Sequence, residues 1–203
     1  MTKIKICGIT RDEDVDYVNL LRPDYIGFVF ASKSRRHVSF ERAAALRAKL
    51  RSEIPSVGVF VDSPLNDVVQ LVEHKTIDVV QLHGAEDEAY IETLKDRVDV
   101  PLIQAFRATS TDDLARAKTS LADFVLLDNG AGGTGKTFDW KIARSFTRPF
   151  FLAGGLNPSN IIQAIELLNP YAVDVSSGVE VDGRKSFEKI RDVVFQVRKR
   201  ARD

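Results

Sequence analysis

Residues 150–178, "FFLAGGLNPSNIIQAIELLNPYAVDVSSG", hold a strand candidate, a helix candidate and a second strand candidate in direct succession. The runs "FFLAGG" (150–155) and "AVDVSSG" (172–178) have the aliphatic and aromatic composition of buried strands. Between them, "PSNIIQAIELL" (158–168) has the apolar spacing of a helix. The stretch predicts one strand-plus-helix unit of an alternating α/β fold.

The same unit recurs along the whole chain, with strand candidates roughly 20 to 30 residues apart. Eight strand candidates are found, each followed by a helix candidate. This alternation predicts a (β/α)8 TIM barrel, slightly compact against a typical ~250 residues. No linker or low-complexity tract divides the sequence, so we expect one domain over residues 1–203. The other six strand candidates are "KIKIC" (3–7), "YIGFVF" (25–30), "SVGVFV" (56–61), "VVQLH" (79–83), "LIQAF" (102–106) and "FVLLD" (124–128).

Charge and cysteine content limit the possible partners. The 29 basic and 29 acidic residues cancel, so no overall field attracts nucleic acid or an anionic membrane surface. The single cysteine cannot form an intrachain disulfide, which is typical of a reducing compartment. Neither a signal peptide nor a run of about 20 apolar residues is present. We therefore expect a soluble cytoplasmic protein with no nucleic-acid or membrane partner.

Strand alternation predicts which side chains point into the barrel. In the first strand Ile4 and Ile6 share the outer face, so Lys5 and Cys7 point inward. Because the eighth strand neighbours the first, Lys5 and Asp174 are expected to form a buried ion pair under the site. The same alternation turns five further polar side chains inward: Gln81, His83, Asp128, Asp174 and Ser176.

The glycine-rich segments after the seventh and eighth strands predict a phosphate site. In TIM barrels these two loops commonly bind phosphate through backbone N–H groups. Gly154, Gly155, Ser176, Ser177 and Gly178 would let the backbone approach an anion closely. The competing interpretation is that they only permit tight turns. We favour a small phosphorylated substrate.

Cys7 and Asp128 are the candidates for acid–base chemistry. Cys7 ends the first strand, where a partly ionised thiol near Lys5 could act as a base. Asp128 ends the sixth strand, three strands away around the ring, so it would face Cys7 across the mouth as an acid. The alternatives are that Cys7 is a small buried apolar residue and that Asp128 anchors the following loop.

Three further side chains are candidates for contact with the substrate. Arg36 follows the second strand in "SKSRRH" and could bind a carboxylate through two hydrogen bonds. The alternatives are that Arg35 takes that part and that the basic residues form a solvated surface cluster. His83 is a candidate substrate contact, with a hydrogen-bonded structural histidine as the alternative.

The three histidines are scattered through the sequence, and no His, Asp and Glu grouping has metal-ligand spacing. We therefore expect no metal.

"GAGGTGKT" (Gly130–Thr137) matches the phosphate-binding loop of nucleotide hydrolases. In such proteins the lysine and threonine open a helix directly, whereas here "FDWKIARSF" follows and Asp139 is the expected helix cap. The segment also lies after the sixth strand of a regular series. We interpret it as a glycine-rich loop at the barrel rim, and keep a nucleotide hydrolase as a remote alternative.

Taken in order, the motifs resemble the phosphoribosylanthranilate isomerase family of tryptophan biosynthesis. The resemblance covers residues 3 to 180, with no departure at the functional positions. It implies an Amadori rearrangement without cofactor or metal, with Cys7 as general base, Asp128 as general acid and Arg36 binding the anthranilate carboxylate. The motifs that carry it are "KICGIT", "GFVF" with "SRR", "GVFV", "QLHG", "LLD", "GGTGKTFDW", "LAGGL" and "DVSSGVE".

Other functions compatible with a phosphosugar barrel stay open. A histidine-pathway aminoaldose isomerase would be expected to use two aspartates, and Cys7 argues against it. A metal-dependent pentose-phosphate epimerase would need histidines and aspartates at the rim. A barrel that binds phosphosugars without catalysis remains an alternative, and it would be indifferent to Cys7→Ser.

Overall fold

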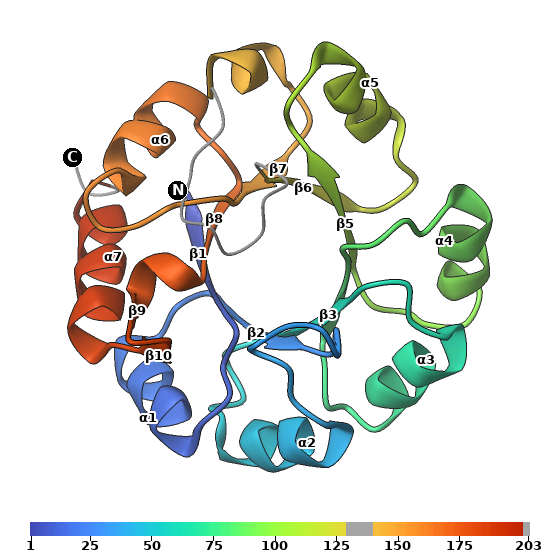
Figure 1. The fold of residues 1–203 in the computed structure, drawn as a ribbon, viewed down its shortest axis with the longest axis horizontal. Coiled ribbons are helices and arrows are strands. Elements are labelled where there is room, and N and C mark those ends of the chain that lie inside the picture. The colour runs from blue at the N-terminus through green and yellow to red at the C-terminus, as the bar shows by residue number, and fades with distance from the viewer. Residues whose placement is uncertain (129–139, 201–203) are drawn as a thin grey trace.

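The eight expected strands form a closed parallel barrel in the computed structural model, which describes residues 1–128 and 140–200. Consecutive strands pair around the ring, and β8 closes it against β1. Figure 1 looks along the barrel and shows the helices as an outer ring. The predicted (β/α)8 fold is confirmed. The strands are β1 (Lys3–Cys7), β2 (Tyr25–Val29), β3 (Ser56–Phe60), β4 (Val79–Leu82), β5 (Leu102–Arg107), β6 (Phe124–Asp128), β7 (Phe150–Leu152) and β8 (Ala172–Val175).

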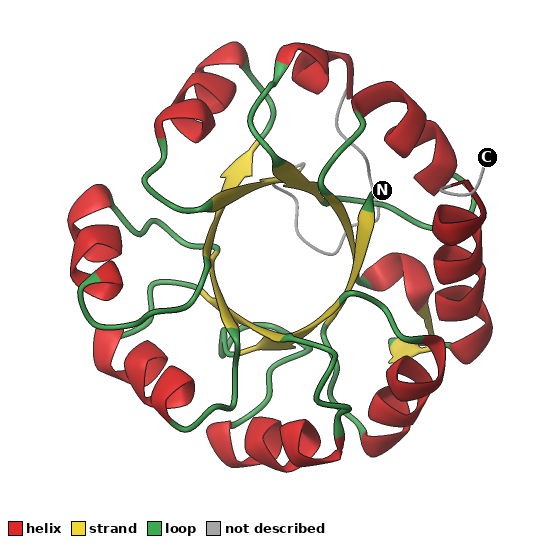
Figure 2. Cartoon of the chain, turned by 180° about the vertical axis from the view of Figure 1, so that it is seen from behind, coloured by secondary structure: helices red, strands yellow, loops and turns green. Residues whose placement is uncertain are grey.

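The helices lie outside the strands, as the view from behind also shows (Figure 2). In α2, Ser39 caps the helix by accepting a hydrogen bond of 3.2 Å from the backbone N–H of Arg42, while Ala43 and Leu46 are buried. Among the described residues, no helix is both long and apolar enough to cross a membrane. The α-helices are α1 (Asp12–Leu21), α2 (Phe40–Lys49), α3 (Leu65–Glu73), α4 (Glu88–Lys95), α5 (Thr111–Thr119), α6 (Ile161–Leu168) and α7 (Phe187–Arg200).

Inward and outward positions alternate along the strands as predicted. Ile4 and Ile6 are buried in the layer between strands and helices, with the outer side chains of the other strands. Val57, Ile103 and Phe151 belong instead to a separate apolar cluster inside the barrel. The inside of the barrel is therefore a packed core, as is usual for this fold.

Two elements differ from the sequence-based expectation. After β6, the described chain forms a short 3-10 helix, η1 (Trp140–Ser145), where we expected a regular helix. Pro149 follows closely and disfavours helical geometry in the residue before it, which limits the room for further turns. The expected cap Asp139 lies outside the described residues.

After β8 the chain forms a small hairpin that we did not predict. It follows the 3-10 turn η2 (Ser177–Val179) and consists of β9 (Glu180–Val181) and β10 (Arg184–Lys185). Asp182 and Gly183 connect the two strands, and both have positive φ, 49° and 76°. An Asp-Gly pair with this geometry is typical of the tightest hairpin turns.

Candidate active site

A cavity of about 390 Å³ opens at the carboxyl ends of the strands. Side chains and backbone from β1, β4, β6 and the loops after β2, β7 and β8 line it together. Segments far apart in the sequence therefore meet at one end of the barrel (Figure 1). Eight of the nine residues predicted for the site lie around this cavity: Cys7, Arg36, His83, Asp128, Gly154, Gly155, Ser176 and Ser177.

The ninth, Gly178, does not line the cavity. A β-carbon at Gly178 would lie 1.9 Å from the backbone oxygen of Leu156. The glycine thus allows the loop after β8 to pack directly against the loop after β7. Gly178 serves the site by permitting this close backbone approach, whereas Gly154 and Gly155 lie on the cavity wall.

Cys7 is a buried, free thiol at the end of β1. It pairs in register with Gly27, where a β-carbon would lie 2.7 Å from the Cys7 sulfur, so Gly27 makes room for the thiol. Burial raises the pKa of Cys7, and the positive charges of Lys5 and Lys185 oppose that rise. The protonated thiol is therefore favoured at neutral pH.

Asp128 and His83 face each other in the cavity. The Nε2 atom of His83 lies 3.6 Å from Oδ2 of Asp128. On the other side of the ring, Nδ1 of His83 lies 2.9 Å from Nε2 of Gln81. Because an amide NH2 group only donates hydrogen bonds, this contact places the proton of a neutral His83 on Nε2, directed toward Asp128.

Arg36, and not Arg35, borders the cavity. The Arg36 side chain is 13% exposed, whereas that of Arg35 is 60% exposed. Arg36 donates to Glu180 through Nε at 2.6 Å and through Nη2 at 2.9 Å. Two parallel hydrogen bonds of this kind orient a guanidinium group strongly. Of the two arginines, Arg36 is therefore the one whose position allows contact with a ligand in this cavity.

The loops after β7 and β8 form another part of the cavity wall. Gly154 and Gly155 have φ values of 88° and 68°, a region that favours glycine. The side-chain amides of Asn157 and Asn160 donate to the backbone oxygen of Gly155 at 3.1 and 3.0 Å and hold the loop in place. Ser176 donates from Oγ to the backbone oxygen of Cys7 at 3.0 Å, which connects the loop after β8 to the end of β1.

Glu180 and Lys185 are two buried charged residues that the sequence-based prediction missed. Lys185 contacts Glu180 at 2.7 Å and donates to the backbone oxygen of Ser176 at 3.0 Å. The Asp-Gly pair in "VEVDGRK" was the signal that could have revealed their hairpin.

The glycine-rich segment Gly130–Thr137, which we interpreted as a loop at the barrel rim, lies outside the described residues.

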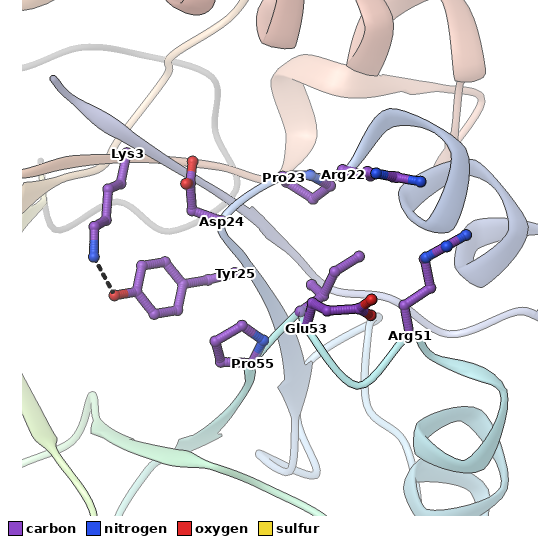
Figure 3. Close-up of a pocket in the computed structure, with 9 residues that line it drawn as sticks. Lys3, Arg22, Pro23, Asp24, Tyr25, Arg51, Glu53 and Pro55 are labelled. Atoms are coloured by element: carbon purple, nitrogen blue, oxygen red, sulfur yellow. Dashed lines mark hydrogen bonds between the residues drawn. The ribbon is translucent and has the colours of Figure 1, made fainter.

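A second cavity of about 310 Å³ lies at the opposite end of the barrel, where β1, β2 and β3 begin (Figure 3). Here Lys3 donates to the hydroxyls of Tyr25 at 3.3 Å and of Tyr171 at 2.8 Å. In TIM barrels this amino-terminal end serves stability, whereas catalysis takes place at the carboxyl ends. Over residues 1–128 and 140–200, neither end gathers three side chains that could hold a metal ion.

The fold and the first cavity define a class of protein, a (β/α)8 barrel with polar side chains gathered where barrel enzymes carry out their chemistry. The family model of N-(5'-phosphoribosyl)anthranilate isomerase matches residues 4–196. The chain belongs to this family.

Individual relatives agree with that assignment. An N-(5'-phosphoribosyl)anthranilate isomerase of Endomicrobium trichonymphae is 50% identical over 198 residues, which cover 96% of this chain and 97% of the relative. The crystal structure of phosphoribosyl anthranilate isomerase from Thermus thermophilus superposes with a TM-score of 0.88 at 35% identity, covering 98% of this chain and 99% of that one. A crystal structure of phosphoribosyl anthranilate isomerase in complex with reduced 1-(o-carboxyphenylamino)-1-deoxyribulose 5-phosphate has a TM-score of 0.87 at 34% identity, covering 98% and 100%.

Proposed function

We propose that this chain converts N-(5'-phosphoribosyl)anthranilate into 1-(2-carboxyphenylamino)-1-deoxyribulose 5-phosphate, an aldose–ketose isomerisation in tryptophan biosynthesis. Family membership and the names of its relatives support this activity. The observation that carries the proposal is one cavity lined by a thiol, a carboxylate, a guanidinium and two glycine-rich loops. These are the groups needed for a base, an acid, a carboxylate site and a phosphate site.

In the first step, Asp128 acts as general acid. It protonates the ring oxygen of the ribose as the bond between that oxygen and C1 breaks. The electron pair on the anthranilate nitrogen forms a double bond to C1, which gives an open-chain Schiff base. The contact between Asp128 and Nε2 of His83 supports this role, because a donor beside the carboxylate stabilises the charge left after the proton has gone.

In the second step, Cys7 acts as general base. Its thiolate removes the proton on C2, and the electron pair of that C–H bond moves toward the nitrogen, giving an enolamine. The enolamine tautomerises to the ketone when its C2 hydroxyl loses a proton and C1 gains one. Protons and electrons balance between the substrate and the two side chains, so the scheme needs no external oxidant or reductant.

The remaining wall of the cavity binds the two ends of the substrate. We assign the anthranilate carboxylate to Arg36 and the phosphate to the backbone around Gly154, Gly155, Ser176 and Ser177. The two positive φ values and the asparagine contacts behind the β7 loop support an anion site made of backbone N–H groups. His83 lies between the two ends and contacts the sugar.

We also propose that the protein works in the cytoplasm. Its single cysteine is free and ends a strand at the active-site cavity, so the proposed base must stay reduced. A reducing compartment meets that need.

The test is turnover of freshly generated phosphoribosylanthranilate, followed by loss of its fluorescence in the presence of EDTA. We expect turnover by the wild type and a loss of about 10²- to 10⁴-fold in kcat/KM in Cys7→Ser and in Asp128→Asn. The carboxylate control is Asp99→Asn, an exposed position near the amino end of β5, which should keep wild-type activity.

Two outcomes would contradict the proposal. A folded wild type that binds the reduced product analogue but turns nothing over would be a binding protein. Full activity in Cys7→Ser would mean that the thiol only packs.

A further inference from the structure

The β9–β10 hairpin places two charged side chains beside the wall of the active-site cavity. Glu180 and Lys185 pair in register across the hairpin, and both side chains are buried. Lys185 also reaches the backbone oxygen of Ser176 at the wall of the active-site cavity. The hairpin therefore connects a buried carboxylate to the site, although Glu180 itself does not line the cavity.

Glu180 fixes one edge of the Arg36 guanidinium. It accepts from Nε at 2.6 Å and from Nη2 at 2.9 Å. An arginine has five N–H groups, so three remain on the edge formed by Nη1 and the outer side of Nη2. Within the described ranges, Arg36 makes no ion pair with any carboxylate besides Glu180.

Packing restricts Arg36 from a second side. A β-carbon on Gly8 would lie 2.4 Å from Cδ of Arg36, so the arginine side chain lies directly over this glycine. Gly8 has a φ of 82° and directly follows Cys7. Arg36 is thus held between the turn after β1 and the hairpin carboxylate, in one orientation beside the proposed base.

Charge at this cluster favours an incoming anion. Glu180 carries one negative charge, and three cations contact it: Arg36, Lys185 and, at 3.2 Å, Arg35. Burial opposes the ionisation of Glu180, but the hydrogen bond from Arg36 and the charge of Lys185 outweigh it and lower the pKa of the carboxyl group. The cluster keeps a net positive charge, so a substrate carboxylate is attracted despite the nearby glutamate.

We propose that Glu180 is a positioning residue that holds the guanidinium of Arg36 so that its free edge faces the carboxylate of the substrate. This inference rests on the proposed function, because it takes the carboxylate of the substrate as the ligand of Arg36. It predicts that the contribution of Glu180 to binding depends on that carboxylate. A residue that only stabilised the fold would affect all ligands alike.

The experiment compares two ligands by calorimetry. One is the reduced product analogue, 1-(2-carboxyphenylamino)-1-deoxyribitol 5-phosphate. The other is the same compound made from aniline, which lacks the carboxylate. We expect Glu180→Gln to weaken the first ligand about tenfold and to leave the affinity for the second within about twofold of wild type. In turnover assays the same variant should raise KM more than it lowers kcat.

Controls separate this role from folding. Asp182→Asn removes a carboxylate from the exposed turn of the same hairpin and should bind both ligands like the wild type. If Glu180→Gln does not fold, Glu180→Asp keeps the charge but shortens the reach to Arg36, and its loss should again be confined to the ligand with the carboxylate.

The possible results separate the two proposals. If the wild type is active, the role of Glu180 is overturned by either of two results. One is that Glu180→Gln loses the same affinity for both ligands, and the other is that it binds the ligand with the carboxylate more tightly than the wild type does. A wild type that neither turns over the substrate nor binds the reduced analogue overturns the proposed function, and the role of Glu180 with it.

Discussion

The ammonium group of Lys5 lies 2.9 Å from Oδ2 of Asp174, inside the barrel and below the mouth. The two residues are register partners on the adjacent strands β1 and β8. Lys5 is fully buried, and Asp174 is nearly so. The ion pair predicted from strand alternation is therefore confirmed, and it closes the ring at the seam between the first strand and the last.

Removing one member of this pair should be costly. Lys5→Met leaves the Asp174 carboxylate buried without its counter-charge, and we expect a loss of about 3–5 kcal/mol in the free energy of unfolding. Lys5→Met combined with Asp174→Leu removes both charges, so the double variant should be more stable than Lys5→Met alone. Urea unfolding of the three proteins measures this. A double variant no more stable than the single one would show that the two charges are not coupled.

The pair also shows why much of the site could be predicted from the sequence. Side chains alternate between the two faces of a strand, so one residue of known direction gives the direction of every other residue in that strand. For this reason the sequence predicted correctly that Cys7, His83 and Asp128 point toward the cavity that they line. Arg36 lies in the loop after β2, so the sequence placed it at the rim, but could not distinguish it from Arg35.

Glu180 and Gly178 were harder to predict because they lie in the short 3-10 turn and hairpin after β8, outside the eight barrel strands. The alternation of the barrel strands does not extend to this hairpin or to the loop that holds Arg36, so the contact between Glu180 and Arg36, 144 positions apart, had no signal in the sequence. Gly178 has the composition of a phosphate loop, but its neighbour is the backbone of Leu156. We expected Gly178 to let the backbone approach an anion, whereas the group that lies against it is the backbone oxygen of Leu156.

Gly27→Ala should separate the placement of Cys7 from the stability of the barrel. The new methyl group would lie 2.7 Å from the Cys7 sulfur and must displace it. A shift of about 1 Å at a catalytic group can cost about 10²-fold in rate, and we expect a loss of that size in kcat. The measurement is steady-state turnover, accompanied by urea unfolding.

Gly58→Ala on the neighbouring strand is the matched control. Its methyl group would meet Ile77 and Phe60 on the outer face, at 2.7 and 2.8 Å. We expect it to cost about 1–3 kcal/mol of stability through overpacking and to leave kcat close to wild type. If both glycine variants lost activity equally, general loosening of the barrel would explain the effect instead.

The pH dependence of kcat/KM should report the ionisation of Cys7. Only the thiolate can act as the base, so kcat/KM should rise with pH as Cys7 ionises. Because burial raises the pKa of Cys7, the midpoint of this rise should lie at a higher pH than the pKa of an ordinary cysteine. The charged groups facing the thiol are Lys5, Asp174 and Lys185, of which the two lysines lower its pKa. Lys185→Met should therefore move the midpoint of this rise to a still higher pH. An unchanged midpoint in this variant would show that Lys185 does not affect the pKa of Cys7.

Rates of alkylation by iodoacetamide give an independent measure. Since Cys7 is the only cysteine, the pH dependence of its alkylation reports the same thiolate without turnover. In the wild type, the pH midpoint of alkylation should agree with the pH midpoint of kcat/KM. If alkylation had a midpoint at a much lower pH than kcat/KM, another group would limit the rate of turnover.

Glu180 should also stabilise the fold in a pH-dependent way. Its pKa is lowered in the folded protein, where burial acts against ionisation but Arg36 and Lys185 outweigh it. The folded state therefore holds the proton less tightly than the unfolded chain, whose glutamate pKa is about 4.3.

The ionised carboxylate of Glu180 therefore contributes its full stability above that pH, and this contribution falls as pH drops toward the pKa of the folded protein. We expect the difference in unfolding free energy between wild type and Glu180→Gln to be largest near neutral pH. It should begin to shrink once pH falls below about 4.3, where the glutamate of the unfolded chain takes up its proton first, and level off once pH is also below the lowered pKa of the folded protein. Urea unfolding of the two proteins across this range measures the difference, and other acidic groups cancel in the comparison. A difference that stayed constant with pH would mean that the glutamate acts through shape and hydrogen bonding alone, and that its charge does not contribute to holding Arg36.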